Sequence, residues 1–263
     1  MAIKLICLDA DDTLWHTERH FHAAHAEIMS LVADFPDSKR MLETSMTDNI
    51  RIYGFGPKSY ILSVLETVAT LMTPKVESQI VLQIIALGKE LLAHPVELLD
   101  GIPDSMDELQ KRAPLVLVTK GDLFHQEAKL AASGIRDRFL DVAIVSDKNP
   151  QTFLDVFKRH GIQASEAMVI GDSMRSDILP ALEAGAYAAF VPHDLAWSFE
   201  TKGEPVESPR FRRVRHMSEI PLWIDAIEVA ENTNPAMHES VLPSIETESV
   251  RFRKQKHKKS RDS

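Results

Sequence analysis

The sequence predicts an α/β fold, in which a parallel sheet carries helices on both faces and an all-α segment is inserted near the start. The second half of the chain alternates short apolar runs, suited to buried strands, with segments of helical periodicity. That order of elements is typical of a parallel sheet. Between the first two apolar runs, over residues 16–96, apolar residues follow helical spacing and no strand pattern stands out.

Each expected strand is a short apolar run, and most end in polar residues or glycine. These runs cover residues 3–8, 114–119, 142–145, 167–170 and 186–191. The expected helices cover about 17–34, 38–50, 58–72 and 75–93 in the insertion, and 104–112, 123–132, 150–160 and 176–185 elsewhere. Parallel sheets bind ligands at the carboxyl ends of their strands. Asp9, Thr119 and Asp172 all fall at such ends, which makes them candidates for a functional site.

Length and charge predict the domain organisation. A chain of 263 residues with 44% hydrophobic content can bury one core of ordinary size and still carry an insertion. We expect residues 1–15 and 97–230 to form the core and residues 16–96 a helical domain. Residues 231–263 are polar, with little periodicity, and are expected to form a disordered basic tail.

The charges are unevenly spread. Residues 251–263 hold seven Lys or Arg and one acid, leaving 23 basic and 38 acidic residues elsewhere, a net charge of -15. The net negative charge outside residues 251–263 argues against strong nucleic-acid binding, because that affinity comes largely from Lys and Arg that neutralise phosphates. The tail is a solvated appendage in the simplest interpretation, and a weak candidate for contact with RNA or anionic lipid.

The first apolar run bears on compartment and redox chemistry. Cys7 is the only cysteine, so an intramolecular disulfide is excluded, and its apolar neighbours predict a buried strand residue rather than a nucleophile. Acids interrupt this run after a few residues, unlike a signal peptide. No run approaches the roughly 18 apolar residues of a membrane span. We therefore expect a cytoplasmic protein.

An acidic cluster follows the first strand and contains Asp9, Asp11 and Asp12. Side chains alternate along a strand, so Asp9 and Asp11 are expected to face the same way. Converging carboxylates repel one another unless a proton or a cation lies between them. Oxygen ligands of this kind suit Mg²⁺ where phosphate is also bound. One carboxylate could then attack phosphorus while the other handles a proton. An acidic strand-to-loop transition without chemistry is the alternative.

Three further strand ends carry polar groups. Thr119 offers a hydroxyl to phosphate oxygens, and Lys148 directly precedes a helix, where its ammonium can reach the site as a point charge. Asp172 and Asp177 follow the fourth strand. Gly171 is expected to allow a tight backbone turn before them.

Together these pieces resemble the haloacid dehalogenase superfamily. The matching segments are Asp9-x-Asp11-x-Thr13-Leu14, Thr119, Lys148 with Pro150, and Gly171-Asp172-x-x-x-x-Asp177, in the family's order. The resemblance covers about residues 3–195 and implies a Rossmann-like core with an aspartyl-phosphate mechanism. It implies Asp9 as the nucleophile, Asp11 as the acid and base, and Thr119 and Lys148 as phosphoryl ligands. It also implies a Mg²⁺ held by Asp9, the backbone carbonyl of Asp11 and Asp172, with Asp177 in support.

Two details refine this resemblance. Asp12 stands where the family most often has glycine, and we assign it no role. The dehalogenase branch lacks the second acid of the first motif. Asp11 therefore favours phosphate chemistry over C–Cl cleavage.

The position of the insertion also resembles one branch of the family. About 85 residues separate the first motif from the second-strand region, whereas about 28 separate Thr119 from Lys148. This resembles members with a helical cap after the first motif, which closes over a small substrate and excludes water. Within it, the segment from Tyr53 to Tyr60 holds Gly54 and Gly56 among aromatic and basic residues. It is either a loop that reaches the leaving group or an interhelix turn anchored by Phe55.

Histidines lie near the first motif. His16 and His20 are one helical turn apart, a spacing that can bind Zn²⁺, but no third ligand is evident nearby. A partly exposed helix face is the preferred interpretation for them and for His25, and substrate contact by His16 or His20 is the alternative. His125 is close enough to Thr119 in sequence to line the cleft. We expect Trp15 to pack at the hinge of the insertion rather than to stack on a base.

The sequence thus predicts a Mg²⁺-dependent phosphatase acting on a small phosphorylated metabolite. Phosphotransferase or mutase chemistry on the same scaffold is the first alternative. A non-catalytic, phosphate-responsive binding module is the second, because response-regulator receivers also place acids, a Thr or Ser and a Lys on a parallel sheet. Receivers lack a long helical insertion and a counterpart of the pair Asp172 and Asp177. Neither the substrate nor the oligomeric state can be predicted.

Overall fold

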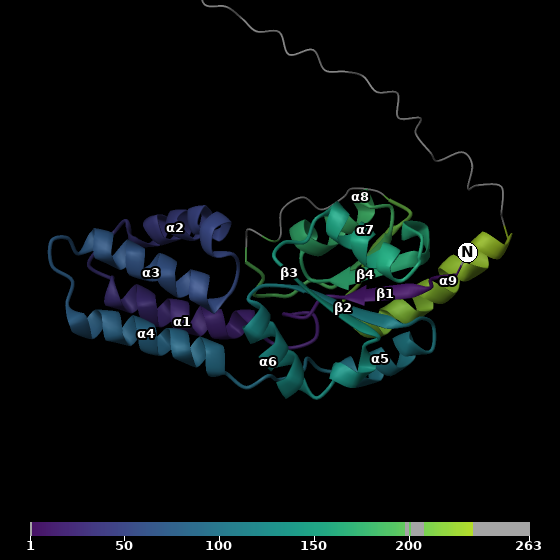
Figure 1. Cartoon of the computed structure of the whole chain (residues 1–263), viewed down its shortest axis with the longest axis horizontal. Helices are drawn as coiled ribbons and strands as arrows, with labels where there is room; N and C mark the ends of the chain where they lie inside the picture. The colour runs from purple at the N-terminus through teal and green to yellow at the C-terminus, as the bar shows by residue number, and fades with distance from the viewer. Residues whose placement is uncertain (1, 198–199, 201–207, 234–263) are drawn as a thin grey trace, which may run out of the picture.

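The described residues form a six-stranded parallel sheet and a separate group of helices (Figure 1). This computed structural model describes residues 2–197, 200 and 208–233, and for residues 231–233 only the backbone. The strands are β1 (Leu5–Leu8), β2 (Leu115–Lys120), β3 (Asp141–Val145), β4 (Ala167–Gly171), β5 (Tyr187–Phe190) and β6 (Phe211–Arg213), in the order β3-β2-β1-β4-β5-β6. Every pairing is parallel, and β1 lies between β2 and β4.

All five strands expected from apolar runs are present, and the α/β fold class is confirmed. The sixth strand, β6, was not predicted. It has three residues, two of them exposed arginines, and pairs only with β5 among the described strands. A short polar edge strand has no apolar run to reveal it.

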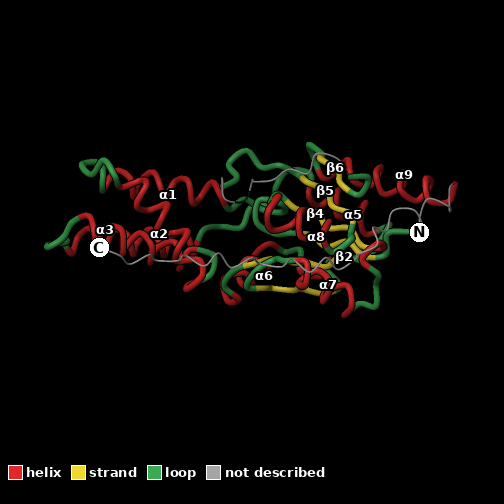
Figure 2. Tube along the Cα trace, turned by 90° about the horizontal axis from the view of Figure 1, so that it is seen from above, coloured by secondary structure: helices red, strands yellow, loops and turns green. Residues whose placement is uncertain are grey.

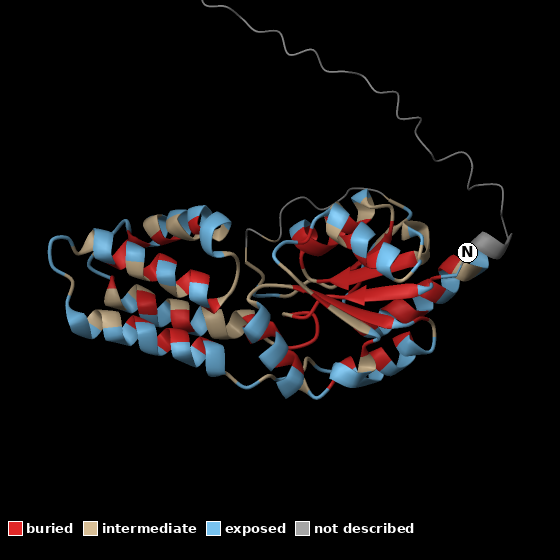
Figure 3. Cartoon of the chain, viewed as in Figure 1, coloured by how far each residue is buried: buried red, intermediate tan, exposed pale blue. Residues whose placement is uncertain are grey.

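Helices cover both faces of the sheet. Residues of β1 alternate between two cores: Ile6 and Leu8 join α5 (Ile102–Gln110) and α9 (Ile220–Thr233), and Leu5 and Cys7 join α7 (Pro150–Arg159) and α8 (Leu179–Glu183). Figure 3 shows the strands buried between these layers. Cys7 is fully buried, as expected, and burial raises the pKa of its thiol to about 12. It is therefore a neutral packing residue.

The insertion folds as four helices with an apolar core of their own. They are α1 (Glu18–Leu31), α2 (Ser38–Tyr53), α3 (Pro57–Leu71) and α4 (Ser78–Ala93). Ile28, Val64 and Ile84 are among the residues buried between them. Figure 2 shows this bundle extending away from the sheet, beyond the edge where the strands end. The helical content of the insertion is as expected; the division into domains at residues 16 and 96 stays a prediction.

The two segments that join the bundle to the sheet lie side by side. Trp15 forms an antiparallel bridge with Leu98, and the backbone N–H of His16 donates to the carbonyl of Glu97 at 3.0 Å. Trp15 is fully buried in the core beneath this pair. It packs at the junction, as the sequence predicted.

The C-terminal region is only partly described. Helix α9 continues to Thr233, so the first three residues of the expected tail have helical backbone. The rest of that tail, residues 234–263, lies outside the described residues. No helix in the described part of the chain could span a bilayer.

Candidate active site

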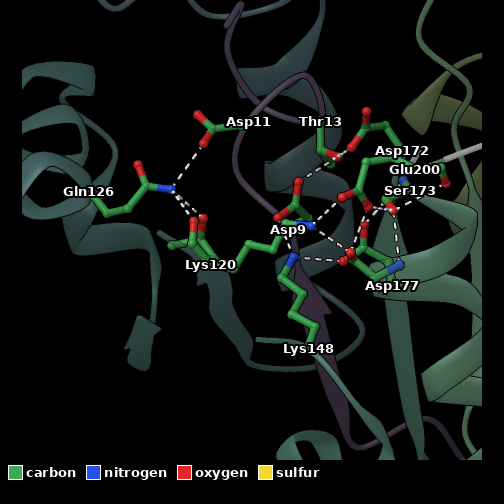
Figure 4. Close-up of polar contacts among 12 residues, drawn as sticks. Asp9, Asp11, Thr13, Lys120, Gln126, Lys148, Asp172, Ser173, Asp177 and Glu200 are labelled. Atoms are coloured by element: carbon green, nitrogen blue, oxygen red, sulfur yellow. Dashed lines mark hydrogen bonds and ion pairs between the residues drawn. The ribbon is translucent and has the colours of Figure 1, made fainter. Parts of the chain in front are cut away.

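The polar residues singled out in the sequence meet at the carboxyl edge of the sheet (Figure 4). Asp9 follows β1, Thr119 lies near the end of β2, Lys148 follows β3 and Asp172 follows β4. Because these strands are parallel neighbours, their ends deliver the side chains to one place. Asp9, Thr119 and Lys148 are all buried.

Lys148 forms the centre of the site. Its Nζ donates to Asp9 Oδ1 in a short contact and to Asp177 Oδ1 at 2.6 Å, and its side chain is 2% exposed. Burial lowers the pKa of Lys148, but the charges of Asp177 and Asp9 outweigh burial and raise the pKa above its ordinary value. The ammonium therefore stays charged, next to the predicted nucleophile.

Three carboxylates surround a position suited to a hard cation. Oxygens of Asp9, Asp172 and Asp177 lie within 4.8 Å of one another, and all three residues are buried. Burial, and then the charges of Asp9 and Asp177, raise the pKa of Asp172 well above its ordinary value. Burial likewise raises the pKa of Asp177 to about 7, against the opposing effect of Lys148. One ammonium does not balance three buried carboxylates, and an all-oxygen set fits Mg²⁺.

Gly171 was expected to allow a tight backbone turn, but the structure gives another reason for a glycine at this position. Its φ is not in the left-handed region, so no tight turn requires a glycine there. A Cβ at Gly171 would instead lie 2.3 Å from Asp177 Oδ2. Asp177 packs against the bare backbone and accepts the N–H of Ser173 at 3.1 Å. It lies in a π-helical turn (Met174–Ile178) before α8, and such turns occur often at functional sites.

Asp11 points away from this cluster. Its Oδ1 accepts hydrogen bonds from Trp15 Nε1 at 2.8 Å, Thr17 Oγ1 at 2.7 Å and Lys129 Nζ at 2.5 Å. Burial raises the pKa of Asp11, but the charge of Lys129 and these hydrogen bonds outweigh it and hold the pKa far below its ordinary range. Asp11 is therefore an ionised carboxylate in this conformation. Its predicted contribution to metal binding, through the backbone carbonyl, stays a prediction.

Two residues of α6 (Leu123–Ser133) complete the surroundings of Asp11, and the sequence did not reveal them. Gln126 Nε2 lies 2.9 Å from Asp11 Oδ2 and 2.7 Å from Thr119 Oγ1, so one amide joins the two motifs. Lys129 is buried beside it, one helical turn further along. The spacing of three residues between Gln126 and Lys129 is the only sequence signal that could have placed them on one helix face.

Comparison with known proteins decides the family. The model of the haloacid dehalogenase-like hydrolases matches residues 3–185, well over half of the chain. The chain belongs to this family.

Individual relatives agree with this assignment. This hydrolase is 27% identical over 194 residues to a glyceraldehyde 3-phosphate phosphatase of Methanopyrus kandleri, covering 70% of this chain and 81% of that protein. It is 24% identical over 150 residues to the N-acylneuraminate-9-phosphatase of Rattus norvegicus, covering 54% of this chain and 58% of the rat protein. A haloacid dehalogenase-like hydrolase of Xanthomonas campestris superposes with a TM-score of 0.80 at 32% identity, covering 89% of this chain and 95% of that one.

Asp12 has a structural role in this hydrolase, although no role was predicted for it from the sequence. Its φ of 58° lies in the left-handed region, which explains why glycine is common there in the family. Its Oδ1 accepts the N–H of Thr17 and its Oδ2 accepts the N–H of Glu18, both at 2.9 Å. N–H groups at the start of a helix such as α1 have no acceptor within the helix, and Asp12 supplies one for each of these two. Asp12 therefore fixes the first inserted helix to the motif.

The loop between α2 and α3 contacts the core beside the site. Gly54 and Gly56 have φ values of 74° and 108°, which fold the loop so that the ring of Phe55 lies 4.0 Å from Lys120 Nζ. Lys58 Nζ, one residue into α3, forms an ion pair with Asp122 Oδ2 at 2.9 Å. Phe55 thus anchors the loop against the core; contact with a leaving group stays a prediction.

Lys120 belongs to a second polar network. Its Nζ lies 2.6 Å from both Ser176 Oγ and Glu200 Oε1, and Ser173 and Ser176 donate to Glu200 Oε2 at 2.5 and 2.6 Å. This network joins the ends of β2 and β4 to Glu200 in the chain after β5 (Figure 4). Nothing in the local sequence around Glu200 indicates it.

The histidines divide into separate groups. His20 stacks on His94 with ring centroids 4.0 Å apart, and His94 lies edge-on to His125 at 6.4 Å. His125 is buried, and burial, with the charge of Lys129, lowers its pKa to about 4, so its ring is neutral. His25 Nδ1 lies 3.2 Å from the hydroxyl of Tyr60. His16 is not part of this stack.

Proposed function

We propose that this chain is a Mg²⁺-dependent phosphatase that hydrolyses a small phosphate monoester through an aspartyl-phosphate on Asp9. The observation that carries the proposal is the buried group of Asp9, Lys148, Asp172 and Asp177 at the ends of adjacent strands. The two phosphatases among its relatives support phosphate esters as substrates.

The first step would form the bond between Asp9 and phosphorus. Asp9 Oδ2 lies 3.3 Å from Thr13 Oγ1, while Oδ1 contacts Lys148. Attack by a carboxylate oxygen on phosphorus breaks the bond to the leaving oxygen, which needs a proton. Bound Mg²⁺ would supply positive charge that offsets repulsion between the carboxylate and the phosphate dianion. Thr119 and Lys148 are proposed to hold the remaining phosphoryl oxygens.

Asp11 is proposed to transfer the proton in both steps, which requires its side chain to turn from Trp15, Thr17 and Lys129 toward Asp9. It is ionised in this structure, which is the form that accepts a proton from attacking water in the second step. An approaching phosphate dianion raises the pKa of a nearby carboxylate by like-charge repulsion, which favours the protonated form needed in the first step. Hydrolysis of the phosphoaspartate then returns Asp9 as a carboxylate and releases inorganic phosphate.

The test is hydrolysis of p-nitrophenyl phosphate and a panel of phosphate monoesters that includes the two substrates named for its relatives. Turnover should require Mg²⁺, stop with EDTA, and fall on the order of 10³-fold or more in Asp9→Asn. Asp37→Asn, the same change at an exposed position in the insertion, is the matched control and should leave turnover unchanged. Full activity in Asp9→Asn, or in EDTA, would refute the proposal.

The same assay addresses transfer to an acceptor other than water. A phosphatase releases inorganic phosphate and alcohol in equal amounts, even when a second alcohol is added. A phosphotransferase or mutase gives less phosphate than alcohol. The cytoplasmic location and the small size of the substrate stay predictions.

A further inference from the structure

A second group of metal-ligating side chains includes Asp12 of the acidic cluster but none of the carboxylates of Asp9, Asp172 and Asp177. Donor atoms of Asp12, His16 and His193 lie within 4.8 Å of one another. Asp12 belongs to the turn after β1, His16 to the segment leading into α1, and His193 to the chain after β5. In the sequence, only the spacing of His16 and His20 was compatible with Zn²⁺, and a partly exposed helix face was preferred. The fold instead brings Asp12 and His193 close to His16, without His20.

The spacing of this group suits a shared metal better than a direct hydrogen bond. Asp12 Oδ1 lies 3.5 Å from His193 Nε2, at the outer limit for a hydrogen bond. A tetrahedral Zn²⁺ at about 2.1 Å from each ligand holds its donor atoms about 3.4 Å apart. Asp12 Oδ1 and His193 Nε2 therefore already lie at about the separation that two ligands of one Zn²⁺ require. His16 is only partly buried, so its ring can rotate to complete the set.

The surroundings of these ligands support the same conclusion. The carboxylate of Asp12 already accepts the N–H groups of Thr17 and Glu18, which fix its orientation as hydrogen bonds do for metal-binding carboxylates.

We infer that Asp12, His16 and His193 form a binding site for a divalent transition cation of the Zn²⁺ class, distinct from the all-carboxylate site of Asp9, Asp172 and Asp177. Two imidazoles and one carboxylate are a donor set that selects Zn²⁺ over Mg²⁺, which prefers oxygen ligands. The ion joins the first motif, the entry to the insertion and the segment after β5. Its binding does not depend on the proposed phosphatase activity.

The inference is tested by metal binding, without reference to turnover. Protein stripped with EDTA and returned to millimolar Mg²⁺ is titrated with Zn²⁺ in competition with a chromophoric chelator. His193→Ala and His16→Ala should each weaken binding of one Zn²⁺ equivalent at least about tenfold, because even loss of a group that only supports a ligand costs 10–100-fold. His20→Ala is the matched control, since His20 is a neighbouring histidine that stacks on His94 outside the group, and it should bind Zn²⁺ as the parent protein does.

Thermal unfolding of the same samples gives a second measurement. Zn²⁺ should raise the unfolding temperature of the parent protein and of His20→Ala, but not that of His193→Ala, because a ligand that binds the native state stabilises it. Undiminished Zn²⁺ binding in both His16→Ala and His193→Ala would overturn the inference. So would a loss confined to His20→Ala, which would assign the ion to the stacked histidines.

Discussion

Replacing Gly171 by alanine places a methyl group where Asp177 already packs. The added Cβ would lie 2.3 Å from Asp177 Oδ2, 2.4 Å from Cγ and 2.7 Å from Cβ. Asp177 is fully buried and is held by Lys148 at 2.6 Å and by the N–H of Ser173 at 3.1 Å. It therefore cannot move aside without losing those contacts.

The expected loss in the free energy of unfolding of Gly171→Ala follows from the two ways in which the protein can relieve the overlap. Overpacking a tight interior costs about 1–3 kcal/mol. Giving up a hydrogen bond to a charged group costs about 1.5–3 kcal/mol. We therefore expect Gly171→Ala to lower the free energy of unfolding by about 3 kcal/mol. Turnover should fall as well, because Asp177 orients the ammonium that contacts Asp9.

The assay is urea unfolding of Gly171→Ala, Asp177→Ala and the double variant. If the methyl acts through Asp177, Asp177→Ala removes the two closest overlaps, with Oδ2 at 2.3 Å and Cγ at 2.4 Å, and leaves that with Cβ at 2.7 Å. The double variant should therefore be less destabilised than the sum of the two by at least about 1 kcal/mol. Gly88→Ala is the comparison for overpacking without a carboxylate: its Cβ would lie 2.7 Å from Cγ1 of Ile61, so whatever it costs should be unchanged by Asp177→Ala. Additive effects at Gly171 and Asp177, or a loss below about 0.5 kcal/mol in Gly171→Ala, would refute the reasoning.

Three further outcomes test individual side chains. Lys129→Met should slow hydrolysis of alkyl phosphates by about 10–100-fold and that of p-nitrophenyl phosphate much less, because Asp11 loses its orienting partner and only the alkoxide needs its proton; equal losses would contradict this role. Asp12→Ala should be about 1 kcal/mol less stable in urea than Asp12→Gly, because both lose the hydrogen bonds to α1 but only alanine keeps a side chain at a φ of 58°; equal stability would count against the strain. In metal-free protein, the pKa of Asp177 is about 7 in the folded state and near 4 when unfolded, so its ionisation makes the free energy of unfolding fall as pH rises from about 4 to 7. Urea unfolding at several pH values should show this fall in the parent protein and a shallower one in Asp177→Asn; identical slopes would exclude Asp177 as the cause.

The parts of this molecule that the sequence revealed are those with local causes. Short apolar runs mark buried strands, and a polar residue at the end of each run lies at the sheet edge whatever the rest of the chain does. That is why the sequence alone is enough to group Asp9, Thr119 and Asp172. The edge strand β6 has no such run, so the sequence gives no sign of it.

Other features depend on contacts between distant segments, which no local pattern encodes. Gln126 and Lys129 face Asp11 only because α6 packs beside β2 in one particular rotation. The contact of Glu200 with Lys120, and that of His193 with Asp12, join residues far apart in the chain. Gly171 was correctly noticed but for the wrong reason, since the backbone conformation that separates a turn from a close approach is not visible in the sequence.

The paired segments at the base of the helical bundle have an evolutionary consequence. Leu99 donates its N–H to the carbonyl of Leu14 at 2.9 Å, so the chain leaves and re-enters the core at neighbouring points of one antiparallel pair. A short hairpin turn could join the same two points without stretching the chain. A different set of helices, or a short turn, could therefore be inserted between these two paired segments while the sheet and its acids keep their positions.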